Sequence, residues 1–364
     1  MATAYETALE KTKNGLKPEV AAAELVALMT LDEKVHCLDG GVPFWVGIKD
    51  ITTGGYHSRP FRAAKVERLG IPGFHFSDGP RGVVVGEATA FPVSMARGAT
   101  FDPELEVRVG DAIGRELRTI GADLYGGICV NLLRHPAWGR AQETYGEDPH
   151  HVGEMGAGLT RGAQRHVMAT LKHFALNSME NARFGVDVKV DERALHEVYL
   201  PHFKRIVDEG VACVMTAYNS VNGEWCSQNE VLLADILRRE WGFTGFVISD
   251  WIFGVHDGVK SLIAGLDVEM PYRMIRNAPI VAALSEGLVT EENITSAATR
   301  TLTTMLKFNV GKLPVSDRSV VLCNEHVLLS QEVAEKSMVL LKNESVDGAS
   351  LLPLNLKNIS KVAV

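Results

Sequence analysis

Charged residues stand at the ends of several apolar stretches of this chain. The stretch "GFVISDW" delivers one carboxylate, Asp250, beside the aromatic ring of Trp251. Asp78 ends a second such stretch, and Lys172 with His173 ends a third. Carboxylate, ammonium and imidazole groups bind hydroxyls or act as nucleophile, acid or base. An aromatic ring offers a flat apolar platform. Together these residue types predict a site for a sugar.

Each of these residues has a structural explanation when it is taken alone. An aspartate after a strand often caps the next helix. Lys172 can pair with a nearby carboxylate, and His173 can be a hydrogen-bonded core residue. Asp267 and Glu269, in a further apolar stretch, can simply close the bottom of a pocket. The recurrence of polar residues at the same place on successive stretches favours the functional interpretation.

Apolar stretches with the character of buried strands alternate with helical patterns. The strand-like stretches are 73–77, 122–131, 167–173, 211–217, 245–250 and 266–270, and the helical patterns lie near 102–120, 150–165, 191–209, 229–241, 254–264, 277–286 and 290–309. This alternation is typical of parallel strands buried on both faces. It predicts an α/β fold, a (β/α)₈ TIM-like barrel with parallel strands, with a doubly wound open sheet as the alternative. In such a barrel the charged residues would meet at the carboxyl ends of the strands.

The N-terminal and C-terminal parts depart from this alternation. Thr30 and Glu33 have the spacing of a capping box, so a helix is predicted to start at Thr30. Residues 40–68 are expected to be irregular. A helix is predicted in "SQEVAEKSMVLLKNES", and a last buried strand at 359–364. The predicted domains are a catalytic barrel over 1–310, a linker with a connecting helix over 311–345, and the start of an incomplete second α/β sandwich domain over 346–364.

Composition and missing motifs narrow the classes of function. The net charge of −8 gives no basic footprint for nucleic acid or an anionic membrane. No apolar run approaches the roughly 20 residues of a membrane span, and the N-terminus lacks signal-peptide features. The five cysteines are scattered, so a cytoplasmic location is expected. Without a GK[ST] loop, GxGxxG or HExxH, we expect no cofactor and no metal.

Several long motifs follow one another along the chain. They are "FSDGPRG", "NLLRHPAWGRAQETYGEDP", "KHFALNSMENARFGVDV", "DERALHEVYLPHFK", "VMTAYNSVNGEWCSQN", "LRREWGFTGFVISDW" and "AGLDVEMP". In this order they resemble glycoside hydrolase family 3, in its β-glucosidase branch. The resemblance covers nearly the whole chain. It implies hydrolysis of terminal β-D-glucosyl residues with retention of configuration.

The resemblance also implies roles for single residues. Asp250 would be the catalytic nucleophile, and Trp251 would stack at the mouth of the pocket by the leaving group. Lys172, Arg140 and Arg183 would each favour the charged form of Asp250. Tyr218 could orient the nucleophile through its hydroxyl. The residues implied to bind the sugar are Asp78, Arg140, Lys172, His173, Arg183, Met215, Tyr218 and Trp251, with Arg134 and Glu143 in supporting roles and Glu269 behind the pocket.

A retaining glycosidase needs a second carboxyl group about 5–5.5 Å from the nucleophile. The resemblance implies that this acid/base glutamate lies in a second domain, absent from this chain. Single-domain members, the β-N-acetylglucosaminidases, use a His–Asp pair after the Lys-His strand. The stretch "KHFALNSMENARFGVD" has no second histidine, which argues against that activity. Glu143, Glu180 and Glu269 are possible substitutes, none of which the sequence favours.

Other functions fit the same residues. The scaffold could serve a β-xylosidase or an α-L-arabinofuranosidase, or a non-catalytic carbohydrate-binding barrel. An aldolase with Lys172 as its Schiff base is a fourth hypothesis. The expected partners are a β-glucoside or oligosaccharide and a missing or separate second domain, with no nucleic acid and no membrane.

Overall fold

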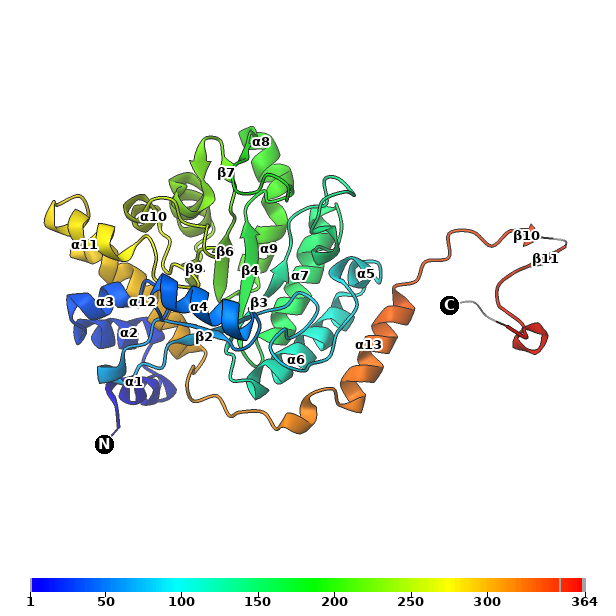
Figure 1. Ribbon diagram of the computed structural model, residues 1–364, viewed down its shortest axis with the longest axis horizontal. Coiled ribbons are helices and arrows are strands. Elements are labelled where there is room, and N and C mark those ends of the chain that lie inside the picture. Colours follow the sequence, from blue (N-terminus) through cyan, green and yellow to red (C-terminus); the bar gives the residue numbers. More distant parts are fainter. Residues whose placement is uncertain (1, 347, 362–364) are drawn as a thin grey trace.

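The computed structural model describes residues 2–346 and 348–361 of the chain. Its centre is a six-stranded sheet, in the order β1-β2-β3-β4-β6-β9, with helices packed around it (Figure 1). From β2 onward, neighbouring strands of this sheet are parallel. The strands are β1 (Phe61–Ala63), β2 (Phe74–Asp78), β3 (Leu124–Cys129), β4 (Met168–Phe174), β6 (Cys213–Thr216) and β9 (Phe246–Ile248).

Isolated bridges close the sheet into a barrel. Val268 bridges β9 in parallel, and the next residue, Glu269, bridges Asp39. Gly40 then bridges β1. A Cβ at Gly40 would lie 2.0 Å from the carbonyl oxygen of Pro271, so the closure requires a glycine. The predicted TIM-like barrel is confirmed. The predicted strand at 266–270 is reduced to single bridges, and β1 runs antiparallel to β2.

Aromatic and aliphatic side chains fill the barrel interior. The rings of Phe74 and Phe246 lie 5.2 Å apart, although their strands β2 and β9 are not neighbours in the sheet. Phe76, Met168 and Ile248 are buried in the same core. This contact across the interior follows from the curl of the sheet.

Helices follow the parallel strands, as the sequence predicts. Asp102 caps α6 by accepting from the backbone N–H of Leu105 at 3.0 Å, and Asp148 caps α7 in the same way. The helices of this part are α6 (Pro103–Thr119), α7 (Pro149–Ala163), α8 (Glu192–Ala194), α9 (Pro201–Asp208), the π-helical stretches Leu195–Tyr199 and Val231–Glu240, α10 (Gly258–Ala264), α11 (Asn277–Ser285) and α12 (Glu291–Lys307). A small second sheet comprises β5 (Asp187–Val188), β7 (Ser220–Val221) and β8 (Glu224–Trp225).

The N-terminal part confirms one prediction and corrects another. Thr30 caps α3 through a capping box with Glu33. The prediction that 40–68 is irregular is wrong, because α4 and β1 lie there. No side-chain cap marks the start of α4, and its Trp45 is exposed, so the usual helix signals are missing. The helices of this part are α1 (Ala4–Lys13), α2 (Pro18–Ala27), α3 (Leu31–His36), α4 (Phe44–Gly54) and α5 (Ser94–Gly98).

The C-terminal part leaves the barrel after α13 (Asn324–Lys336), which packs against α6 (Figure 1). The helix predicted over 330–345 is misplaced, because α13 already starts at Asn324 and 337–344 is not helical. A short antiparallel pair follows, β10 (Ser345–Val346) and β11 (Ala349–Ser350). Of the strand predicted at 359–364, residues 359–361 show no strand and 362–364 lie outside the described residues. Within the described chain, no helix is both long and apolar enough to cross a bilayer.

Candidate active site

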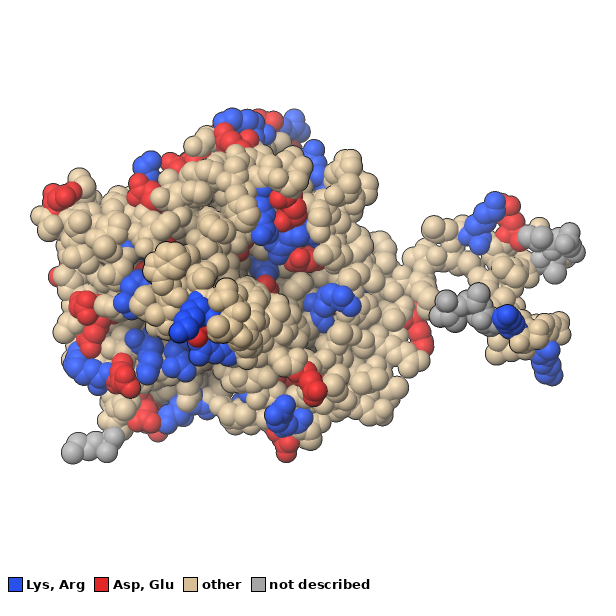
Figure 2. All heavy atoms as spheres, viewed as in Figure 1, with Lys and Arg blue, Asp and Glu red and all other residues tan. Residues whose placement is uncertain are grey.

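The carboxyl ends of the parallel strands gather the predicted residues into one cavity. Asp78 ends β2, and Lys172 and His173 are among the last residues of β4. Asp250 follows β9 closely. In the space-filling view this end of the barrel is hollowed, with basic and acidic side chains inside the hollow (Figure 2). The cavity measures about 180 Å³ and is lined by Tyr56, Asp78, Arg140, Lys172, His173, Arg183, Met215, Tyr218, Asp250 and Trp251.

Asp250 presents one carboxylate oxygen without a partner. Its Oδ1 accepts from the backbone N–H of Trp251 at 2.7 Å. Its Oδ2 is buried and accepts no hydrogen bond from any described residue. The nearest basic side-chain nitrogen among the described residues, His173 Nε2, is 3.7 Å away, beyond hydrogen-bond distance. The arrangement leaves a free oxygen in the cavity, as a nucleophile requires.

Burial raises the pKa of Asp250 above its ordinary value. Arg140, the backbone N–H of Trp251, and Lys172 oppose this rise. The sequence-based expectation was that nearby cations would favour the charged form. Arg140 and Lys172 do so, but the loss of water around the carboxylate outweighs them.

Buried Lys172 and partly exposed Asp78 form an ion pair in the cavity wall. Nζ and Oδ1 are 2.6 Å apart. Burial lowers the pKa of Lys172, but the charge of Asp78 more than offsets this and raises the pKa to about 12. For Asp78 the directions are reversed. Burial raises the pKa of this carboxyl, but the charge of Lys172 more than offsets the rise and brings the pKa below its usual value. Both groups are therefore charged at neutral pH, which suits hydroxyl binding and opposes a Schiff-base role for Lys172.

Arg140 is held by a two-fold contact with Glu143. Its Nε and a terminal nitrogen donate to the two carboxylate oxygens at 2.9 and 2.7 Å. Burial raises the pKa of Glu143, but Arg140 lowers it overall. The supporting role predicted for Glu143 agrees with this geometry. Arg134, by contrast, lies over the ring of Tyr199 and does not line the cavity.

Arg183 reaches the cavity from the loop after β4. One terminal nitrogen donates to Glu180 Oε2 at 3.0 Å. The guanidinium also lies 4.7 Å from the ring centres of Phe184 and Tyr218. Trp138 Nε1 donates to the other oxygen of Glu180. Two ring contacts and a fixed carboxylate orient Arg183 toward the cavity.

His173 is fixed in the neutral form. Its backbone N–H donates to Asn131 Oδ1 at 2.9 Å, and the Asn131 amide donates back to its carbonyl at 2.9 Å. Burial, followed by the charges of Arg140 and Lys172, holds the pKa of His173 well below its ordinary value. A neutral imidazole in the cavity offers a hydrogen bond without adding charge.

The aromatic residues depart from the sequence-based picture. Trp251 is only 7% exposed and packs against Phe61 and Phe76, so it forms the wall and does not stand at an open mouth. The Tyr218 hydroxyl donates to the backbone carbonyl of Trp251 at 2.8 Å. It also lies close enough to lower the pKa of Asp250.

Sequence reasoning missed Tyr56, which comes from the loop between α4 and β1. Its ring packs against Phe61, and the charges of Asp78 and Asp250 add to burial in raising its pKa. The aromatic residues of the 55–61 stretch were the only available signal. Exposed Phe184 and Phe253 also contact each other beside Tyr218, at 5.3 Å.

Three glutamates were possible acids, and none lines the cavity. Glu143 and Glu180 are engaged by arginines. Glu269 is fully buried, accepts from the backbone N–H groups of 274–276, and has a pKa raised to about 7 by burial and Asp39. Besides Asp250, the only described carboxylate that lines the cavity is therefore Asp78.

Comparison with known proteins identifies the family. The sequence model of the family described as "Glycosyl hydrolase family 3 N terminal domain" matches residues 45–304 of this chain. The chain belongs to glycosyl hydrolase family 3. The family assignment made from the motifs is confirmed.

Three similar proteins are named as β-glucosidases. A β-glucosidase of Rhizobium radiobacter is 38% identical over 356 residues, covering 94% of this chain and 40% of that protein. Thermostable β-glucosidase B of Acetivibrio thermocellus is 37% identical, covering 91% of this chain and 43% of that protein. β-Glucosidase 3B from Thermotoga neapolitana in complex with glucose gives a TM-score of 0.82 at 34% identity, covering 92% of this chain and 48% of that one. The chain thus spans less than half the length of these relatives.

Proposed function

We propose that this chain is the barrel of a retaining β-glucosidase, which binds a terminal β-D-glucosyl residue and carries the nucleophile, Asp250. One observation carries the proposal. Every residue predicted to bind or attack the sugar lines a single cavity of about 180 Å³, into which Asp250 offers an unpartnered oxygen. The names of the relatives support glucose as the sugar.

In the first step Asp250 Oδ2 forms a bond to the anomeric carbon. The bond from that carbon to the leaving oxygen breaks, and its electron pair goes to the leaving group. In the second step water attacks the same carbon and gives up one proton to the acid/base carboxyl or to solvent, the bond to Asp250 breaks, and its electron pair returns to the carboxylate. Two displacements retain the configuration of the sugar.

The unpartnered oxygen favours catalysis over simple sugar binding. A buried polar atom without a partner costs about 1–3 kcal/mol, and native proteins hold few of them. A binding protein could meet a sugar hydroxyl with an amide and avoid a buried charge. A nucleophile must instead keep one lone pair unengaged for the substrate.

The acid/base carboxyl is proposed to come from a second domain beyond the described barrel. Two facts support this: no described glutamate lines the cavity, and the chain spans less than half of its relatives. On poor leaving groups, lack of a general acid is expected to slow the barrel alone by roughly 10²–10⁴-fold. Leaving groups that depart without a proton would not be affected.

The first test is intact mass spectrometry with a 2-deoxy-2-fluoro-β-glucoside that carries a dinitrophenyl leaving group. We expect a fluoroglucosyl adduct that maps to Asp250. The same experiment with the xyloside and arabinofuranoside separates the three sugar specificities.

Two variants serve as controls. Asp250→Ala should give no adduct, whereas Asp208→Ala, a change to an exposed aspartate on α9, should react like the parent chain. An adduct that persists in Asp250→Ala contradicts the nucleophile assignment. Binding of glucose without any adduct, on a chain that circular dichroism shows to be folded, would favour the carbohydrate-binding barrel.

A further inference from the structure

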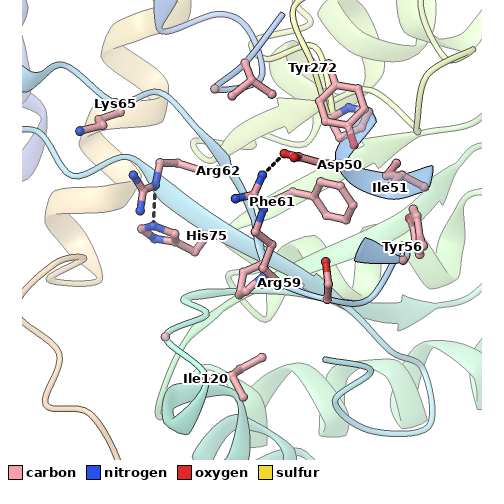
Figure 3. A pocket seen from close by; sticks show the side chains of 17 residues that line it. Asp50, Ile51, Tyr56, Arg59, Phe61, Arg62, Lys65, His75, Ile120 and Tyr272 are labelled. Atoms are coloured by element: carbon pink, nitrogen blue, oxygen red, sulfur yellow. Dashed lines mark hydrogen bonds and ion pairs between the residues drawn. The ribbon is translucent and has the colours of Figure 1, made fainter. Parts of the chain in front are cut away.

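A second, larger cavity lies on the outside of the barrel wall. It measures about 620 Å³ and runs along β1, between α4 and the end of α6 (Figure 3). It exists because β1 pairs antiparallel with β2, so no crossover helix covers this strand pair. We call it the outer groove. Its wall toward the sugar cavity includes Tyr56, which lines both.

The outer groove is basic, although the chain carries a net charge of −8. Its lining contains Arg59, Arg62 and Lys65 and a single acid, Asp50. Basic side chains gather on the same face beneath α4 (Figure 2). Arg59 is neutralised by an ion pair with Asp50 (Figure 3). Arg62 and Lys65 therefore supply the charge available to a ligand.

Arg62 is held in place by a chain of fixed groups. Its Nε donates to His75 Nε2 at 2.8 Å (Figure 3). An arginine Nε–H is only a donor, so His75 Nε2 accepts, and its Nδ1 carries the hydrogen toward Asp123 Oδ2 at 3.2 Å. Asp123 Oδ1 also accepts from the backbone N–H of His75 at 2.7 Å. The buried carboxylate thus fixes the imidazole, and the imidazole orients the guanidinium.

The two terminal nitrogens of Arg62 remain unused. Among the described residues neither makes a hydrogen bond or an ion pair, while the side chain stands exposed in the groove. Within the part of the chain that the structure describes, Lys65 makes only a 3.5 Å contact, with exposed Glu67. A pre-oriented guanidinium fork matches two oxygens of a phosphate or a carboxylate. Ordering the arginine beforehand also reduces the entropy lost on binding.

We propose that the outer groove binds the phosphate or carboxylate group of a small molecule, with Arg62 as its fork, Lys65 as a second charge and His75 as the residue that positions Arg62. Nothing in the sugar chemistry of the barrel uses these residues. The site is separate from the nucleophile cavity and stands or falls independently of the glycosidase proposal.

The test titrates the chain with three matched ligands: glycerol 3-phosphate, glycerate and neutral glycerol. Calorimetry measures affinity at low salt, and the NMR signal of the Arg62 Nε–H reports contact. We expect the phosphate, the carboxylate or both to bind, and glycerol not to bind. Arg62→Gln should weaken binding at least about tenfold, and His75→Gln should weaken it less, because the charge remains.

Arg193→Gln is the matched control, since Arg193 is exposed, lies outside the groove and carries the same charge. It should bind like the parent chain. Binding of neither anion overturns the proposal, and so does equal binding by the Arg62→Gln and Arg193→Gln variants. If Arg62→Gln proves unfolded by circular dichroism, Lys65→Gln, on an exposed lysine, provides the same comparison.

Discussion

Two clusters of buried charged residues lie in this barrel, and they differ in how many hydrogen-bond partners they give to a buried carboxylate. In the cavity around Asp250, which is proposed to bind the sugar and is called the sugar cavity below, Asp250 Oδ2 has no partner among the described residues. Where the barrel closes, Asp267 is saturated. Its Oδ1 accepts from Arg300 at 2.7 Å, and its Oδ2 accepts from Arg238 at 2.6 Å and from the backbone N–H of Val247 at 2.7 Å.

The difference separates a structural charge from a reactive one. Asp267 exchanges its lost hydration for two arginine donors and the backbone N–H of Val247, which ties β9 to the closing segment. Asp250 receives fewer donors than burial demands, and burial raises its pKa. Of these two carboxylates, only Asp250 lines the cavity and has an oxygen without a partner among the described residues, so only Asp250 can meet a substrate there.

The largest expected effect is on Asp250. Asp250→Asn should slow formation of the glycosyl-enzyme by roughly 10⁴-fold or more, the scale at which nucleophilic machinery is lost in other enzymes. Because the folded state raises the pKa of this carboxyl, removing the charge should leave the free energy of unfolding unchanged or increase it. Mass spectrometry measures the first effect and urea unfolding the second. A marked loss of stability would make Asp250 a structural charge like Asp267.

Asp267→Asn should show the opposite combination. It leaves Arg238 and Arg300 without their carboxylate, so the free energy of unfolding should fall by about 3 kcal/mol. Adduct formation, measured on the folded fraction, should persist. Asp208→Asn on the surface should change stability by less than about 0.5 kcal/mol. If Asp267→Asn and Asp208→Asn changed the free energy of unfolding equally, the ion pairs of Asp267 with Arg238 and Arg300 would not be needed for stability.

Glu269, which bridges Asp39 where the barrel closes, should contribute to the pH dependence of stability. The folded state raises the pKa of Glu269 from 4.5 to about 7. Between these values the unfolded chain has lost a proton that the folded chain keeps. The contribution of Glu269 to the free energy of unfolding is then fully present below about pH 4.5. It falls as the pH rises toward 7, by up to about 1.4 kcal/mol per pH unit. Urea unfolding of Glu269→Gln should show a flatter profile over this range, and an unchanged profile would assign the slope to other groups.

Lys172→Ala should weaken sugar binding by roughly tenfold or more, because a charged donor to hydroxyls is lost. The dependence of adduct formation on the leaving group should stay the same. Glucose titration and a series of aryl glucosides measure the two properties. A changed leaving-group dependence with unaltered glucose affinity would place Lys172 in the chemistry instead of in binding.

The smallest effect is expected for Tyr56→Phe, which removes only a hydroxyl from the cavity wall. Loss of one neutral hydrogen bond should reduce glucose affinity by roughly two- to tenfold. Calorimetry with glucose tests this directly, and Tyr199→Phe outside the cavity is the control. Identical affinities in both variants would show that the Tyr56 hydroxyl does not contact the sugar.

Short sequence motifs predict the structure correctly where the interaction joins residues close together in the chain. The cap at Thr30 involves residues three apart, so the sequence contains the whole interaction. The helix at α4 was missed because it has no side-chain cap and its apolar residues Trp45 and Val46 are exposed, so neither a cap nor a buried face marks it in the sequence. The helix predicted over 330–345 ends at Lys336, although the apolar pattern continues.

The convergence of Asp78, Lys172, His173 and Asp250 was determined by the sequence alone. Parallel strands bring their carboxyl ends together, so polar residues that follow successive apolar stretches must converge. The tertiary structure alone decided how those residues behave. It buried Trp251 in the wall, added Tyr56 from a distant loop, and surrounded Asp250 with too few donors. Burial, and the partners that burial brings, are sums over segments far apart in the chain, and no local pattern records them.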